Sequence, residues 1–106
     1  MIKDAVLVFV TCASIKEADK IVDTLLNKKL IACANILSGI KSKFWWKGNI
    51  ENAKEVLIMA KTRTSKFAAI DKEVRRIHSY EVPEIVAMPI IAGSSKYLNW
   101  IAESLK

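Results

Sequence analysis

The chain has 106 residues, of which 52% are hydrophobic, and a formal net charge of +6 at neutral pH. This length and composition predict a single globular domain, residues 1–106, with a small core. No apolar run approaches the roughly 20 residues of a membrane-spanning helix, which argues against a membrane protein.

The first residues and the cysteines indicate a cytoplasmic protein. Met1–Asp4 lead directly into a strand pattern, without the apolar core and cleavage site of a signal peptide. In a reducing compartment Cys12 and Cys33 are expected to be free thiols. Their spacing is also too wide for a CxxC redox or zinc motif.

A strand and then a helix are predicted at the start of the chain. Residues Ala5–Thr11 form a continuous apolar run, typical of a central strand that is buried on both faces. Ser14 and Glu17 have the spacing of a capping box, which marks a helix start. Apolar residues then recur at helical spacing up to Leu26, and the helix is expected to end near Lys28–Lys29.

The middle of the chain predicts two further strands joined by a tight turn. Leu30–Leu37 and Ile40–Trp46 are expected to form one interrupted strand. Lys47–Asn49 has the composition of a hairpin turn, and the following strand centres on Val56–Ala60.

The last third predicts a helix, a strand and a terminal helix. Apolar residues at helical spacing run from Phe67 to Ile77, and a strand is expected over Ile85–Ala92. Gly93–Ser95 breaks that strand and is expected to cap a short helix carrying Tyr97–Leu105.

The resulting order, βαββαβ with an added C-terminal helix, predicts an α+β fold of the ferredoxin-like sandwich type. Right-handed crossovers place both long helices on one face of the sheet. Pro89 lies inside the last strand and has no amide proton, so this strand is expected at a sheet edge.

Three consecutive rings favour self-association. Phe44, Trp45 and Trp46 share a strand, so Trp45 must face opposite to its neighbours. Because helices cover one sheet face only, at least one ring would be left in water unless another copy or the terminal helix covers it.

Several short motifs together resemble the CutA family over essentially the whole chain. They are Cys33-Ala34-Asn35, Trp46-Lys47-Gly48, Glu55 with Lys61-Thr62, His78-Ser79-Tyr80-Glu81-Val82-Pro83-Glu84, and Gly93 with Tyr97-Leu98-Asn99-Trp100. The resemblance implies a non-enzymatic homotrimer linked to divalent-cation tolerance, copper above all, and similar in architecture to PII signalling trimers. Family members commonly have proline where this chain has Ser79, and also in the turn that here reads Cys12-Ala13-Ser14.

The loop after the second long helix holds the only histidine and is the candidate site. We expect His78, Cys12, Glu81 and Glu84 as possible ligands of copper or another divalent ion, at a cleft between subunits. For His78 the alternative is a helix-end histidine bonded to a carbonyl.

Six further residues are expected at the cleft or subunit boundary: Trp45, Trp46, Tyr80, Lys61, Cys33 and Asn35. Cys33 lies among small apolar residues, which favours plain packing. Asn35 would be costly if buried alone, so it is expected to satisfy backbone groups.

Other functions fit less well. The mixed basic and aromatic run Lys41–Lys47 suggests nucleic-acid binding, but a central strand, Val56–Ala60, has no ring on which a base could stack. An acylphosphatase-like enzyme needs an arginine in the loop Thr11–Ser14, which has none. A PII-like sensor of nucleotides or other small molecules is the main alternative. No organic cofactor is predicted.

Overall fold

The computed structural model describes residues 3–106. The prediction that the chain starts without a signal peptide concerns Met1–Asp4, and Met1 and Ile2 lie outside the described residues. The elements are β1 (Ala5–Cys12), α1 (Ile15–Asn27), β2 (Cys33–Trp46), β3 (Asn49–Arg63), a 3₁₀ turn η1 (Thr64–Lys66), α2 (Phe67–Ile77), β4 (Ile85–Pro89) and α3 (Ser95–Ser104). This order confirms the predicted βαββαβ pattern and the added helix. Within residues 3–106, no helix has the length and apolar character needed to cross a membrane.

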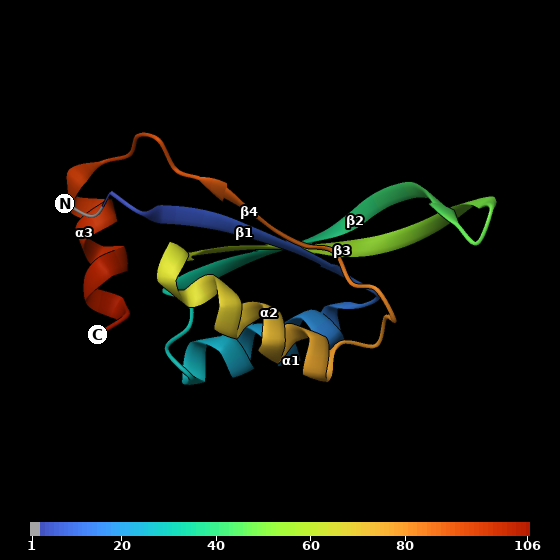
Figure 1. The fold of residues 1–106 in the computed structure, drawn as a ribbon, viewed down its shortest axis with the longest axis horizontal. Helices are drawn as coiled ribbons and strands as arrows, with labels where there is room; N and C mark the ends of the chain where they lie inside the picture. Colours follow the sequence, from blue (N-terminus) through green and yellow to red (C-terminus); the bar gives the residue numbers. More distant parts are fainter. Residues whose placement is uncertain (1–2) are drawn as a thin grey trace.

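The four strands form one antiparallel sheet in the order β2-β3-β1-β4 (Figure 1). Strand β1 pairs on both sides, as its continuous apolar run predicted. Strand β4 lies at an edge and ends at Pro89, which confirms the position inferred from the missing amide proton.

Helices α1 and α2 cover one face of the sheet and enclose the main core (Figure 1). The core is made of alternate residues of β1 and β3 and the inner sides of both helices, chiefly Val6, Val8, Val10, Val56, Ile58, Ala60, Ile21, Leu25, Ile70 and Val74. Helix α1 begins at the predicted cap, because the Ser14 hydroxyl accepts a hydrogen bond from the Glu17 amide at 3.1 Å.

Two predicted strand ends are wrong. Strand β2 begins at Cys33 rather than Leu30, because the Leu30 amide bonds to the Leu25 carbonyl and Lys29 adopts a left-handed φ of 58°. These contacts complete the exit turn of α1. Strand β4 ends at Pro89 rather than Ala92, since its pairing with β1 runs only from Ile85 to Pro89. One further hydrogen bond, from the Ile90 amide to the Ala5 carbonyl, follows before the chain leaves for α3.

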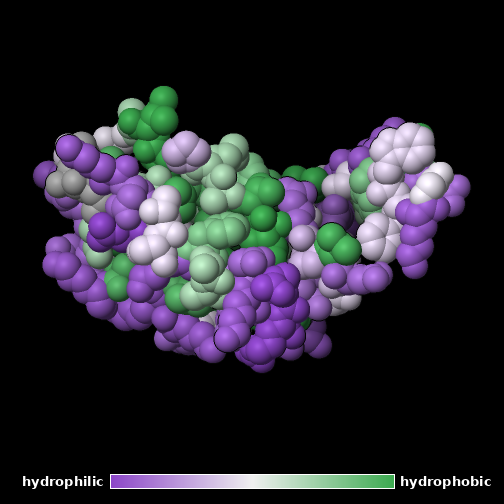
Figure 2. All heavy atoms as spheres, viewed as in Figure 1, coloured by the Kyte–Doolittle hydropathy of each residue, from purple (hydrophilic) through white to green (hydrophobic). Residues whose placement is uncertain are grey.

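The other sheet face is covered only in part. Leu98 and Ile101 of α3 pack with Ala5 in a second, smaller core at one end of the sheet. Strand alternation places further apolar side chains along the rest of this open face. They are Leu7 and Phe9 of β1, Leu37 of β2, and Val86 and Met88 of β4, of which the last three are exposed. Apolar side chains gather over the middle of the molecule, above the polar helix layer (Figure 2).

Strands β2 and β3 extend past the sheet as a long hairpin, so the molecule measures 45 × 26 × 22 Å (Figure 1). Its turn is the residue pair Lys47 and Gly48, with φ of 49° and 82°, as a two-residue hairpin requires. Near the tip Trp45 pairs across the strands with Ile50, and its ring is 72% exposed.

Helix α1 provides a test of this core. Ile21 is fully buried, whereas Ile15 on the same helix is 45% exposed. We expect Ile21→Ala to lower the free energy of unfolding by about 3 kcal/mol, because it removes buried methyl groups and leaves a cavity. Ile15→Ala should cost less than about 1 kcal/mol. Urea denaturation of both variants checks this, and equal losses would contradict the assignment.

Candidate functional site

A groove of about 800 Å³ lies between the hairpin and the loop after α2. Figure 2 shows the surface hollowed between the hairpin and the body of the molecule. The lining comes from the end of β1, the outer halves of β2 and β3 and the loop: Thr11, Ser42, Lys43, Phe44, Trp45, Trp46, Glu51, Asn52, Ala53, Glu55, Tyr80, Glu81, Val82, Pro83 and Glu84. Of the predicted cleft residues, Trp45, Trp46 and Tyr80 are therefore brought together with Glu81 and Glu84.

His78 fixes the start of the loop rather than facing the groove. It caps the C-terminus of α2, and its imidazole has no exposed surface. Nε2 lies 2.8 Å from the Thr11 carbonyl oxygen, to which it must donate, and Nδ1 accepts from the Tyr80 amide at 3.0 Å. Both ring nitrogens are thus engaged in hydrogen bonds within the fold. This agrees with the alternative prediction for His78, a helix-end histidine that bonds to a carbonyl.

Glu17 joins the same loop to the start of α1. Its carboxylate accepts hydrogen bonds from the Ala13 amide at 3.1 Å, the Ser79 amide at 2.7 Å and the Ser79 hydroxyl at 3.1 Å. Burial alone would raise the pKa of Glu17, but these hydrogen bonds hold the pKa below its ordinary value. Ser79 therefore supplies two of the three donors to this carboxylate.

Tyr80 and Glu55, which both line the groove, are hydrogen-bonded to each other. The Tyr80 hydroxyl donates to a Glu55 carboxylate oxygen at 2.8 Å, and Glu55 is only 8% exposed. Burial raises the pKa of Tyr80, and the hydrogen bond to Glu55 raises it further. The phenol is therefore a neutral donor that anchors the loop to β3.

Cys12 is also unsuited to metal binding in this conformation. The residue is fully buried, with Sγ 3.6 Å from the Ser14 carbonyl oxygen. Burial raises the pKa of its thiol to about 11, so the thiolate that a metal ion needs is disfavoured at neutral pH. The predicted ligands His78 and Cys12 thus lie beneath the groove, while Glu81 and Glu84 line it.

Among residues 3–106 there is no group of three or more histidine, cysteine or acidic side chains close enough to hold a metal ion.

The remaining predicted residues lie at the opposite end of the sheet, beside α3. Cys33 pairs with Lys61 across β2 and β3, and its sulfur lies 3.4 Å from the Tyr97 hydroxyl. The Lys61 ammonium donates to the side-chain oxygen of Asn35, so Asn35 bonds to a side chain and not to the backbone as predicted. Tyr97 in turn stacks on Trp100.

Sequence reasoning missed part of the groove and its support. Glu17 was interpreted as a helix cap only, and Glu51 and Glu55 were not assigned to the site. Strand alternation was the available signal, because Val56 and Ile58 point to the core and Glu55 must therefore point away from it.

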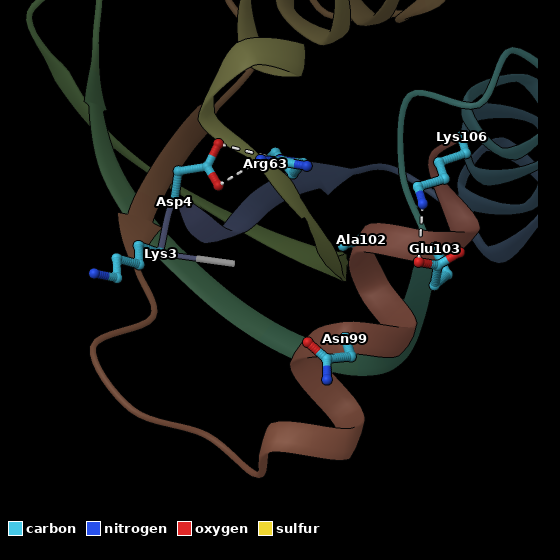
Figure 3. Close-up of a pocket in the computed structure, with 7 residues that line it drawn as sticks. All are labelled: Lys3, Asp4, Arg63, Asn99, Ala102, Glu103 and Lys106. Atoms are coloured by element: carbon cyan, nitrogen blue, oxygen red, sulfur yellow. Dashed lines mark hydrogen bonds and ion pairs between the residues drawn. The ribbon is translucent and has the colours of Figure 1, made fainter. Parts of the chain in front are cut away.

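A second, open pocket lies at the α3 end, between the start of β1 and the last helix (Figure 3). Most of its charged side chains are already paired, since Asp4 binds Arg63 at 3.2 Å and Glu103 binds Lys106 at 3.0 Å. This pocket therefore offers little unpaired charge to a ligand.

The Glu17 contacts predict a pH dependence of stability. Folding lowers the pKa of the Glu17 carboxyl, so its ionised form stabilises the folded protein. This stabilisation is fully present above the pKa of an unfolded glutamate, roughly 4.3. It is lost as the pH falls from there through the lower pKa of the folded protein. We expect Glu17→Gln to lower the free energy of unfolding by about 1–3 kcal/mol at pH 7, because hydrogen bonds to a charged acceptor are weakened.

Denaturation of the wild type and Glu17→Gln between pH 7 and pH 2 measures this effect. The gap between the two proteins should shrink below about pH 4.3. Glu103→Gln is the matched control, since Glu103 is largely exposed and its loss should change stability little at any pH. A gap that stayed constant with pH would contradict the role of the Glu17 carboxylate.

Comparison with known proteins agrees with this architecture. Residues 6–104 match the family described as CutA1 divalent ion tolerance protein. The divalent-cation tolerance protein CutA of Archaeoglobus fulgidus is 46% identical over 99 residues, which are 93% of this chain and 96% of that protein. The rice chloroplastic protein CutA 1 is 36% identical over 102 residues, and the chain spans 58% of its length.

Solved structures give the same result. The structure of the periplasmic divalent cation tolerance protein CutA from Archaeoglobus fulgidus superposes with a TM-score of 0.93 at 45% identity, covering 96% of this chain and 99% of that one. The sequence, the ferredoxin-like sheet and the added α3 all agree. The chain belongs to the CutA1 family of divalent ion tolerance proteins.

Proposed function

We propose that this chain acts as a homotrimer in tolerance to divalent metal ions, binding the ions weakly where subunits meet and catalysing no reaction. The observation that carries the proposal is the pair of groove carboxylates, Glu81 and Glu84, on a loop whose start is held by hydrogen bonds of His78 and Glu17. Since one chain gathers no three metal ligands within residues 3–106, a complete site needs groups from more than one copy.

The open sheet face supports self-association. Apolar side chains of β4 and β2, including Val86, Met88 and Leu37, are exposed there in the single chain. The edge strands β2 and β4 also leave backbone groups unpaired on their outer sides. A second copy would cover both features, and closed cyclic symmetry would limit the assembly.

The chemistry of the donors bears on the metal. The family resemblance suggests copper, which imidazole and thiolate ligands would suit, but His78 and Cys12 are engaged inside the fold. Carboxylate ligands favour harder ions. We therefore propose divalent binding through Glu81 and Glu84, with copper as one ion to test and manganese as the harder comparison.

A nucleotide-sensing role receives less support. The groove carries four glutamates and one lysine, Lys43, so it would repel phosphate groups.

A location in the cytosol rests on the sequence argument alone, and the Archaeoglobus relative is described as periplasmic. Fractionation of the source cells tests the location.

The oligomeric state can be measured directly. In sedimentation velocity the wild type should have three times the 11.9 kDa mass of one chain. Met88→Glu on the open face should shift the protein toward smaller species, because assembly would then bury a charge in the contact between subunits. Leu26→Glu, at similar exposure on the helix layer, is the matched control and should stay trimeric. A wild-type monomer at micromolar concentration would contradict the proposal.

Metal binding is tested by calorimetric titration with Cu²⁺ and Mn²⁺. The double variant Glu81→Gln, Glu84→Gln should weaken binding by about tenfold or more, because each change removes an anionic ligand. Glu103→Gln, outside the groove, should bind as the wild type does. Unchanged affinity in the double variant would show that the ions bind elsewhere.

A further inference from the structure

The two ring nitrogens of His78 have opposite roles in their hydrogen bonds. Nε2 donates to the Thr11 carbonyl oxygen at 2.8 Å, whereas Nδ1 accepts from the Tyr80 amide at 3.0 Å. This arrangement requires the neutral ring, because a protonated imidazole donates from both nitrogens. Protonation therefore leaves the bond to Thr11 intact but makes Nδ1 a donor that faces another donor, the Tyr80 amide.

A second partner for Nδ1 lies close by. Glu17 Oε2 is 3.8 Å from Nδ1, and among residues 3–106 Glu17 is the only carboxylate within ion-pair distance of this ring. The His78 side chain has no exposed surface, so an acceptor for a protonated Nδ1 must come from the protein. The Tyr80 ring, with its centroid 4.7 Å from that of the imidazole, and the C-terminal end of α2 also favour a positive charge here.

The other titratable groups around the ring are either neutral or already paired. Cys12, next to Thr11 in the chain, and Tyr80 are neutral at pH 7, since burial raises the pKa of both. The Glu55 carboxylate of β3 accepts the Tyr80 hydroxyl at 2.8 Å. The nearby charged residues of α2 pair with each other: Arg75 with Asp71, and Arg76 with Glu73. Glu17 is therefore the charged group that can stabilise a protonated His78.

The bond that protonation would break holds the start of the groove loop. Residues 80–84 line the groove, and the Tyr80 amide is the point at which His78 holds their backbone. Without this bond the backbone is released there, while the Tyr80 hydroxyl stays on Glu55. The state of one ring nitrogen thus decides how firmly the loop is held.

We propose that His78 is a proton-driven latch of this loop: when the ring takes up a proton, Nδ1 releases the Tyr80 amide and pairs with Glu17, and the backbone of residues 80–84 loosens. The latch goes beyond metal tolerance and does not depend on it, because it concerns the loop in the absence of any metal ion.

The chain has one histidine, so NMR of the full-length protein with isotope-labelled histidine follows the ring nitrogens of His78 alone. The titration, in metal-free buffer, covers about pH 8 to pH 5, the range in which histidine side chains generally change charge. As Nδ1 gains a proton, the Tyr80 amide should lose at least about tenfold of its protection against hydrogen exchange, corrected for the intrinsic pH dependence of exchange. The His78 amide, bonded to the Val74 carbonyl in α2, is the internal control and should stay protected.

Two variants separate the acceptor from the proton. Glu17→Gln removes the carboxylate beside Nδ1, so protonation of the ring should need a pH lower by about one unit. Glu103→Gln is the matched control, because this carboxylate is exposed on α3, and the ring should titrate there as in the wild type. His78→Asn offers an oxygen that accepts from the amide two residues on but takes up no proton, so protection of the Tyr80 amide should not change with pH.

The wild-type titration decides the proposal even if a variant does not fold. A ring that stays neutral down to about pH 5, or one that gains a proton while the Tyr80 amide stays protected, would overturn the latch. A Glu17→Gln ring that titrates as the wild type does would overturn the pairing with Glu17. Because every readout is taken without metal, the latch can fail while the metal proposal stands, and the reverse also holds.

Discussion

Two segments that are distant in sequence meet at one place: the connection from β1 to α1, and the end of α2. Each brings backbone groups that find side-chain partners there. The Thr11 carbonyl and the Tyr80 amide are both satisfied by the ring of His78. The amides of Ala13 and Ser79 are satisfied by the carboxylate of Glu17. Because these hydrogen bonds join residues 11–17 to residues 78–80, the two side chains fix the path of the following loop.

The groove depends on that fixed path. The loop carries Glu81 and Glu84 on one wall, and Tyr80 ties it to Glu55 of β3. The opposite wall is the hairpin, whose rings are exposed in the single chain. A rigid loop facing a projecting hairpin can present charges and rings at set positions, which a mobile loop could not do.

The two ends of the sheet have different roles in the structure. At one end α3 covers part of the open face and forms a small core around Ile101. At the other end the rings of the hairpin stay partly exposed within residues 3–106, Trp45 most of all, and apolar residues in the middle of the open face are also exposed. The open face and the groove are therefore neighbouring surfaces of one chain.

The sequence by itself determined the strands, the long helices and their order, because apolar periodicity and caps such as Ser14 act locally. It also placed β4 at an edge through Pro89, and it singled out the loop from His78 to Glu84. It could not decide which way those side chains point. Only the tertiary structure turned His78 and Cys12 inward and brought Glu55 beneath Tyr80, because these contacts join segments far apart in the chain and depend on how the layers pack.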